Sequence, residues 1–277
     1  MSETIGRLRL EAAGVALGEE YERFIDHLAD VLLRPGAVVV DGGANGGRHT
    51  IPFARRIAPG GTVHAFEPLA DILDGNRAWA RSDGFDAVVR YAAVALWDAP
   101  GESVFHRNIS DPAWSSLRFQ PPGMTTEPVR VRLATLDQLL PTECVDFIKL
   151  DVEGAELPAL RGGPRLLARS APFVVFENAL QWAATCFGYT VEDFFGLFAR
   201  HGLQLFDAFG RPFSREMWDN PDVGWYFCAF PPSRLTADRY RTLAHLFWDR
   251  AARAADGAPR AQPEAAATAD VGARRGT

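Results

Sequence analysis

The chain has 277 residues and a formal net charge of −6, with 47% hydrophobic and 23% charged residues. This composition is ordinary for a globular protein of one domain plus appendages, and the acidic balance argues against nucleic-acid binding, which needs a basic face. No stretch reaches the roughly 18 apolar residues of a membrane span. Three cysteines without C-x-x-C spacing predict reduced thiols in a cytoplasmic protein rather than a disulfide frame or a zinc site.

Strand-like and helix-like patterns alternate along the first hundred residues, which predicts an α/β fold with a parallel sheet covered by helices. In chain order these segments are a helix over 20–33, a strand over 37–40, a helix over 50–58, a strand over 62–66, a helix over 70–82 and a strand over 87–93.

Residues 101–133 break this rhythm, because two alternating segments flank a stretch rich in Pro, Ser and Gly, which predicts a β-hairpin-like insertion with a long loop. The remaining predicted elements are a helix at 136–140, a strand at 145–151, a helical segment over 156–167 with a break at Gly162-Gly163-Pro164, a strand at 172–177, a helix at 194–201, antiparallel strands at 203–208 and 225–230, and a helix over 236–255. We expect an N-terminal helical segment (1–35), one catalytic domain (36–255) and a disordered tail (256–277).

The segment 38–47 combines a buried strand with a tight turn of small residues. Ala44 breaks the dinucleotide fingerprint, and no Gly-Lys-Ser/Thr follows to make a P-loop. A carboxylate at Asp41 repels a pyrophosphate but can hold the ammonium of an amino-acid moiety. The pattern Asp41, Gly43 and Gly46 therefore favours S-adenosylmethionine (SAM) over a nucleotide, with a plain ligand-free turn as the alternative.

Further acids follow the other strands, and ligands of open α/β sheets bind at these carboxyl ends. Glu67 is placed to accept hydrogen bonds from both ribose hydroxyls of an adenosine, unless it serves only as a helix N-terminal acid. The third strand ends without an acid, so we expect an adenine to meet backbone groups near Ala93, or Asp98 further along.

Several motifs together resemble the FkbM-type SAM-dependent methyltransferases over about residues 36–177. They are Asp41-Gly-Gly-Ala-Asn-Gly-Gly47, Ala65-Phe-Glu-Pro68, Ser115-Ser-Leu117, Thr135-Leu-Asp137, Ile148-Lys-Leu-Asp-Val-Glu-Gly-Ala-Glu156 and Leu160-Arg-Gly162. The resemblance implies a class I (Rossmann-like) methyltransferase fold, with a seven-stranded, mainly parallel sheet between helices on both faces. It also implies SAM as methyl donor and O-methylation of a sugar, polyketide or related natural product.

The resemblance also assigns site residues. The expected cofactor-binding residues are Asp41, Gly43, Ala44, Asn45, Gly46, Glu67, Pro68, Ala93 and Asp151. Lys149, Asp151, Glu153 and Glu156 are implied to border the reaction site. The additional glycines Gly42 and Gly47, where the family usually carries larger apolar residues, predict a mobile loop that orders when the cofactor binds.

For catalysis we expect Asp151 as the general base or acceptor-orienting group, with Glu153 as the second candidate. The alternative for Glu153 and Glu156 is a pair of acids capping a helix N-terminus. Lys149 alternates with Asp151 on one side of its strand, which predicts an electrostatic role. His49 is either a base that contacts the acceptor or a solvated first-turn histidine.

Three alternatives stay open. Asp151, Glu153 and Glu177 have the oxygen ligands that a divalent cation prefers, although we expect no metal. A nicotinamide-dependent oxidoreductase on a Rossmann-like fold is the main functional alternative, and a degenerate binding protein is another. We expect a small hydroxylated acceptor as partner, with no nucleic acid and no membrane.

Overall fold

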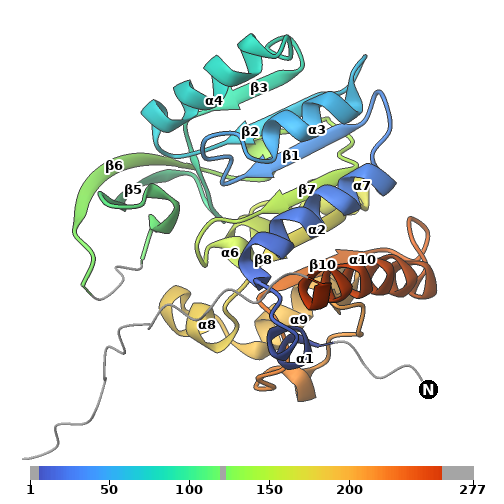
Figure 1. The fold of residues 1–277 in the computed structure, drawn as a ribbon. Coiled ribbons are helices and arrows are strands. Elements are labelled where there is room, and N and C mark those ends of the chain that lie inside the picture. The colour runs from blue at the N-terminus through green and yellow to red at the C-terminus, as the bar shows by residue number, and fades with distance from the viewer. Residues whose placement is uncertain (1–5, 119–122, 258–277) are drawn as a thin grey trace, which may run out of the picture.

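A computed structural model describes residues 6–118 and 123–257. Its centre is a seven-stranded sheet (Figure 1). Across the sheet the strands are β3 (Val89–Ala92), β2 (Thr62–Phe66), β1 (Val38–Gly42), β7 (Phe147–Leu150), β8 (Phe173–Glu177), β10 (Tyr226–Phe230) and β9 (Gln204–Asp207). The pairing is mixed rather than mainly parallel, because β10 runs antiparallel to both of its neighbours while the other adjacent pairs are parallel.

Helices cover both faces of this sheet, as predicted (Figure 1). One face packs against α2 (Leu17–Leu32), α3 (Thr50–Ile57) and α10 (Ala237–Gly257). The other packs against α5 (Leu136–Leu139), α6 (Glu156–Arg161), α7 (Pro164–Ser170), α8 (Gln181–Phe187) and α9 (Val191–Arg200). α4 (Ala70–Ser82) contacts the edge strand β3, and α1 (Arg7–Ala12) precedes α2.

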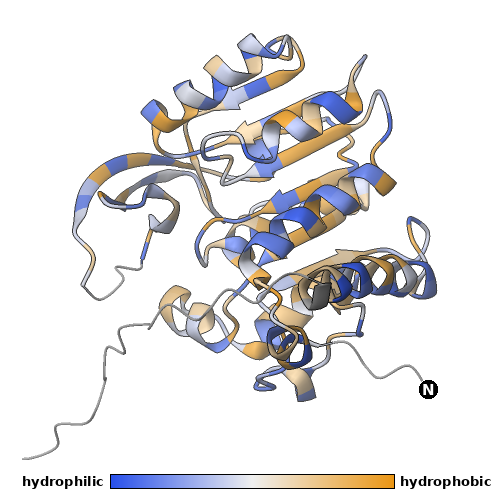
Figure 2. Ribbon diagram, viewed as in Figure 1, coloured by the Kyte–Doolittle hydropathy of each residue, from blue (hydrophilic) through white to orange (hydrophobic). Residues whose placement is uncertain are grey.

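Alternation along the strands explains the two cores. Val39 faces the core beneath α2 and α3, whereas the next residue, Val40, faces the opposite core. The central strands are apolar over most of their length (Figure 2). Asp41 on β1 and Lys149 on β7 are register partners, so these two charged residues lie next to each other on adjacent strands.

The predicted hairpin-like insertion is present as a separate sheet. β5 (Gly101–Asn108) pairs antiparallel with β6 (Thr126–Ala134), and β6 also pairs with the short strand β4 (Ala95–Leu96). This ribbon projects from the main sheet in Figure 1. Its connecting segment contains a 3₁₀ turn at Pro112–Trp114, and residues 119–122 lie outside the described part.

Most predicted elements agree with the structure within a few residues, and the last two strands pair antiparallel as expected. The break predicted at Gly162-Gly163-Pro164 is confirmed, because α6 ends at Arg161 and α7 begins at Pro164. α10 continues to Gly257, just past the predicted start of the tail, whose remaining residues lie outside the described structure. Among the described residues, none of the helices has the length and apolar character to cross a membrane.

Candidate active site

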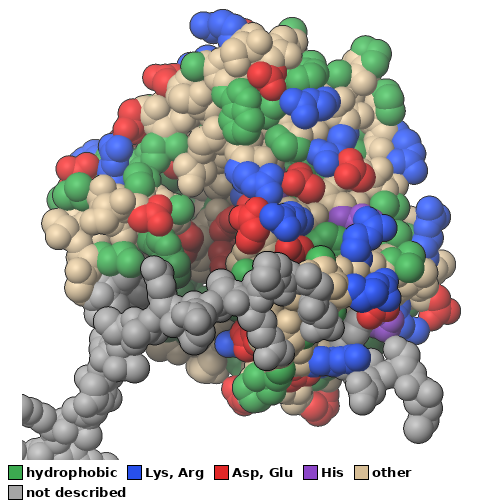
Figure 3. Space-filling model, in the orientation of Figure 1, with side chains coloured by type: hydrophobic (Ala, Val, Ile, Leu, Met, Phe, Trp, Pro, Cys, Tyr) green, Lys and Arg blue, Asp and Glu red, His purple; other side chains and the backbone are tan. Residues whose placement is uncertain are grey.

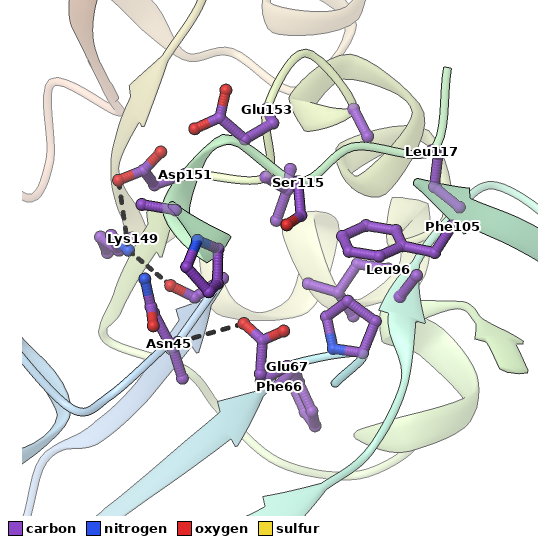
Figure 4. A pocket seen from close by; sticks show the side chains of 18 of the residues that line it. Asn45, Phe66, Glu67, Leu96, Phe105, Ser115, Leu117, Lys149, Asp151 and Glu153 are labelled. Atoms are coloured by element: carbon purple, nitrogen blue, oxygen red, sulfur yellow. Dashed lines mark hydrogen bonds and ion pairs between the residues drawn. The ribbon is translucent and has the colours of Figure 1, made fainter. Parts of the chain in front are cut away.

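A cavity of about 300 Å³ lies at the carboxyl ends of β1, β2 and β7. Its lining comes from the β1 turn, the β2 tip, the β7 turn, helix α2 and the insertion. On the molecular surface, acidic side chains lie in a hollow with basic side chains beside it (Figure 3). The close-up shows Asp151 and Glu153 on one side and Leu96, Phe105 and Leu117 on another (Figure 4). The site is therefore charged in one part and apolar in another.

Glycines in the β1 turn allow two backbones to approach closely. Gly43 has φ +71°, and a Cβ built there would lie 1.7 Å from the carbonyl oxygen of Asp151. Gly47 has φ +101°, and its Cβ would lie 2.9 Å from Asn76 Oδ1. At Gly42 a Cβ would lie 2.6 Å from Leu150 Cδ2. Close packing thus accounts for these glycines, while the ordering of the loop on cofactor binding stays a prediction.

Asp41 lies beneath the cavity rather than in its lining. The residue is 0% exposed, and its Oδ2 accepts a hydrogen bond from Thr50 Oγ1 at 2.6 Å. Its Oδ1 lies 3.5 Å from Lys149 Nζ. The direct contact between Asp41 and an ammonium group, predicted from the sequence, is therefore not the arrangement in the structure. The carboxylate neutralises a buried lysine instead.

Lys149 links the β1 and β7 turns. Its Nζ donates a hydrogen bond to the carbonyl oxygen of Gly43 at 3.0 Å and lies 3.7 Å from Asp151 Oδ2. Burial opposes its charge, but the carboxylates of Asp151 and Asp41 outweigh burial and raise the pKa of Lys149. The ammonium is therefore a fixed positive charge in the cavity wall, in line with the electrostatic role expected of it.

Glu67 lines the cavity at the tip of β2, as predicted. Its Oε2 accepts a hydrogen bond from Asn45 N at 3.2 Å, and its Oε1 accepts one from Leu69 N at 3.0 Å. Burial raises the pKa of Glu67 to about 7 despite these two bonds. Pro68, Ala44 and Asn45 also line the cavity, whereas Gly46 does not.

The β7 turn holds Glu153 in an uncommon conformation, with φ +52°. Ser116 Oγ of the insertion donates a hydrogen bond to the carbonyl oxygen of Glu153 at 2.9 Å. Glu156 Oε1 accepts hydrogen bonds from Val152 N at 3.0 Å and Gly154 N at 3.1 Å. Glu156 therefore closes the turn from below and does not border the cavity, which corrects the role implied by the resemblance.

The acids of the β7 turn and the β8 tip differ in their protonation. Burial opposes ionisation of Asp151, but the Lys149 ammonium and hydrogen bonds with Glu177 and Tyr226 outweigh it and lower the pKa of Asp151. Burial and the charges of Asp151 and Glu156 raise the pKa of Glu153 to about 9. Burial and Asp151 likewise raise the pKa of Glu177 well above its ordinary value. One ionised carboxylate thus lies among acids that retain protons at neutral pH.

His49 is buried at the cavity wall and is not a solvated first-turn residue. Its Nε2 lies 2.8 Å from Glu22 Oε2. Burial lowers its pKa, but the carboxylates of Asp26 and Glu22 reverse this and raise it above the ordinary value. Because His49 is engaged by acids of α2, it is a poorer candidate for the base than the β7 turn.

Ala93 and Asp98, the residues named for the adenine, are exposed and outside the cavity lining, whereas residues 94–96, directly after Ala93, do line it. An adenine contact with the backbone near Ala93 stays a prediction. Sequence reasoning also missed Phe105, which the alternating pattern of its strand placed only in a half-buried position, and Glu22 and Arg48. Glu22 lies within α2 and Arg48 just before α3, and only the apolar faces of these helices carried a sequence signal.

Comparison with known proteins gives one family match. Residues 41–202, more than half of the chain, match the family described as Methyltransferase FkbM domain. No curated protein matches the sequence.

Solved structures that match this chain include the methyltransferase FkbM from Methylobacillus flagellatus KT (15% identity, TM-score 0.46, covering 72% of this chain but only 45% of that one). Others are the O-methyltransferase TomG from Streptomyces achromogenes, in complex with SAM (11%, TM-score 0.41, covering 78% and 80%), and a geranyl diphosphate methyltransferase, also in complex with SAM (12%, TM-score 0.43, covering 77% and 85%).

Proposed function

This chain belongs to the FkbM methyltransferase family, and from that premise we propose that it transfers the methyl group of SAM to a hydroxyl oxygen of a small molecule. The observation that carries the proposal is the cavity itself. One cavity joins a glycine turn, a carboxylate at the β2 tip and an acidic turn after β7. The first two suit an adenosine with a charged tail, and the third suits a hydroxyl that must lose its proton.

The residues present fit SAM as the donor. Phe66, Leu96, Phe105 and Leu117 offer an apolar wall for a planar base. Glu67 adds the carboxylate that can accept hydrogen bonds from two neighbouring hydroxyls. Gly43 carries no Cβ, so the β1 turn can lie directly against the backbone of Asp151, which brings the β1 and β7 turns together at the cavity.

When bound, SAM supplies an electrophilic methyl group, so the protein need only align the acceptor oxygen, exclude water and remove a proton. Positioning of this kind contributes up to about 7–11 kcal/mol in favourable intramolecular reactions. Asp151, held ionised by Lys149, orients the acceptor hydroxyl. Glu153, whose pKa is raised to about 9, is the better proton acceptor once it is ionised. This reverses the order expected from the sequence.

We propose a hydroxylated sugar, polyketide or related natural product as acceptor, in a cytoplasmic enzyme. An exposed aromatic side chain beside the site supports a ring-bearing acceptor: Trp114, between the cavity-lining residues Ala113 and Ser115, is 49% exposed. The nicotinamide-dependent alternative loses its support, because family membership points to methyl transfer and Ala44 breaks the dinucleotide fingerprint.

Isothermal titration calorimetry with S-adenosylhomocysteine, the product of the donor, tests the proposal, with NAD as the competing ligand. We expect binding of S-adenosylhomocysteine and none of NAD. Replacing Glu67 by alanine should weaken the binding. A protein that binds NAD and not S-adenosylhomocysteine would refute the methyltransferase proposal.

We further expect the affinity for S-adenosylhomocysteine to increase between about pH 6 and pH 8. Glu67 accepts two hydroxyl hydrogen bonds best as a carboxylate, and its pKa is raised to about 7. Below that pH the residue carries a proton and loses acceptor capacity. Calorimetry across this range should show the increase in the wild type and a flat profile in Glu67→Gln; the same slope in both proteins would assign the effect to another group.

Chelation should leave methyl transfer intact. Asp151, Glu153 and Glu177 can each place a carboxylate oxygen within 4.8 Å of the others, as a divalent cation would require. Lys149 already supplies a positive charge there, and the raised pKa values of Glu153 and Glu177 reduce the negative charge further. Turnover measured after dialysis against EDTA checks this; loss of activity that Mg²⁺ restores would establish a metal-dependent site.

A further inference from the structure

The cavity extends along the sheet edge from the segment after β3 to helix α2. The sheet order β3, β2, β1, β7 places residues 94–96 at one end, Glu67 next, and the β1 turn and β7 turn beyond it. Glu22 in α2 and Arg48 just before α3 line the cavity from elements that pack on the opposite face of the sheet from residues 94–96. A ligand with a base at one end and hydroxyls at Glu67 therefore directs its remaining end toward α2.

Asp41 is not available to bind that end, because it is buried and paired with Thr50 and Lys149. The carboxylates that do line the cavity are Glu22, Glu67, Asp151 and Glu153. Glu67 is assigned to the two ribose hydroxyls, and Asp151 Oδ2 already faces Lys149 and the hydroxyl of Tyr226.

Two of these acids keep uncommitted oxygens, Glu153 and Glu22. Glu153 lies in the β7 turn and retains its proton at neutral pH, because its pKa is raised to about 9, which leaves Glu22 for a cationic group. Within the described part of the chain, its hydrogen bond to His49 Nε2 and its 3.9 Å contact with Arg48 Nε both involve Oε2. Arg48 Nη1 lies 2.9 Å from Asp26 Oδ2. Because a guanidinium carries five N–H donors, others remain for a ligand. An acceptor and a donor of opposite charge thus stand side by side in the cavity lining, which is the complement of a zwitterion.

We propose that Glu22 and Arg48 bind the amino-acid end of SAM, with Glu22 accepting from its ammonium and Arg48 donating to its carboxylate. This inference rests on the proposed function. It also assigns a binding role to α2, which lies before the family match that begins at residue 41. The first turn of α3, which follows Arg48, adds the positive end of a helix dipole for the same carboxylate.

Calorimetry with two ligands tests the proposal: S-adenosylhomocysteine, and 5′-methylthioadenosine, which keeps the adenosine and lacks the amino-acid end. Glu22→Gln and Arg48→Gln should each weaken S-adenosylhomocysteine binding by about tenfold or more, as expected for a lost hydrogen bond between charged groups. Affinity for 5′-methylthioadenosine should be unchanged in both. Glutamine retains the hydrogen-bonding capacity that Glu22 uses with His49, so the variant preserves local packing.

Glu19→Gln is the matched control. Glu19 lies on the same helix with its side chain 59% exposed, and it pairs only weakly with Arg23, at 3.5 Å. It should bind both ligands as the wild type does. Unchanged affinity for S-adenosylhomocysteine in both test variants overturns the inference, as does an equal loss for both ligands, which would indicate a damaged cavity. A wild type that binds 5′-methylthioadenosine and S-adenosylhomocysteine equally would overturn it while leaving the adenosine site intact; one that binds neither would refute the proposed function as well.

Discussion

Replacing Lys149 by methionine is expected to destabilise the protein by about 3–5 kcal/mol, because removal of one partner leaves buried charge without compensation. The lysine side chain is 4% exposed, and its Nζ lies within 4 Å of carboxylate oxygens of both Asp41 and Asp151. Methionine fills similar space but offers no charge and no hydrogen bond to Gly43. The free energy of unfolding in urea, measured without ligand, checks this expectation.

Two further variants separate charge from packing. The double variant Asp41→Asn with Lys149→Met should recover part of the loss, because it removes one of the stranded carboxylates while Thr50 can still donate to the asparagine oxygen. Arg130→Met removes an exposed pair with Glu102, whose side chains are 80% and 65% exposed, and should change stability by less than about 1 kcal/mol. A single Lys149→Met variant as stable as Arg130→Met would show that the buried network contributes nothing.

Glu153→Gln is expected to lower the rate of methyl transfer by about 10²–10⁴-fold, the range typical of a lost general base. A base acts only when deprotonated. Because the pKa of Glu153 is raised to about 9, the wild-type rate should increase with pH up to that value and then level off. The variant should lose this increase while binding S-adenosylhomocysteine normally. Release of S-adenosylhomocysteine against a panel of hydroxylated acceptors, followed from pH 6 to 10, measures both effects.

Asp151→Asn distinguishes orientation from proton transfer. It should also slow the reaction, because Asp151 lines the cavity beside Lys149, but the increase toward alkaline pH should remain. If the pH profile flattens in Asp151→Asn and persists in Glu153→Gln, the base is Asp151, as first expected from the sequence.

The sheet and most helices could be predicted because apolar periodicity records which side of each element is buried. Periodicity cannot be recognised in a short element: β4 has only two residues, and α8 is a seven-residue helix between loops. Apolar periodicity also carries no information about what the polar face of a helix contacts. Tyr21, Phe24 and Ile25 marked the buried side of α2, but nothing in the pattern showed that Glu22 faces a cavity.

The depth of Asp41 illustrates a second limit. Because Asp41 stands at the end of a strand, the sequence predicted it at the ligand-binding edge of the sheet. Alternation along β7 correctly placed the side chains of Lys149 and Asp151 on the same side. The sequence does not show which side chains contact Asp41 in the folded protein. Thr50, nine residues later, donates a hydrogen bond to its Oδ2, and Lys149, from a different strand, lies beside its Oδ1. Such a choice between a ligand and internal partners depends on side chains brought together only by folding.

The hydrogen bond from Ser116 of the insertion to Glu153 of the β7 turn bears on how these two segments stay joined while Glu153 changes its protonation state. Ser116 holds the peptide carbonyl of Glu153 and leaves the carboxyl group alone. This hydrogen bond therefore does not depend on whether the carboxyl group carries a proton, and the insertion can stay bonded to the β7 turn in both states. In the proposed mechanism, the hydrogen bond and the proton transfer use different atoms of Glu153, so the turn at positive φ keeps the same anchor in both protonation states.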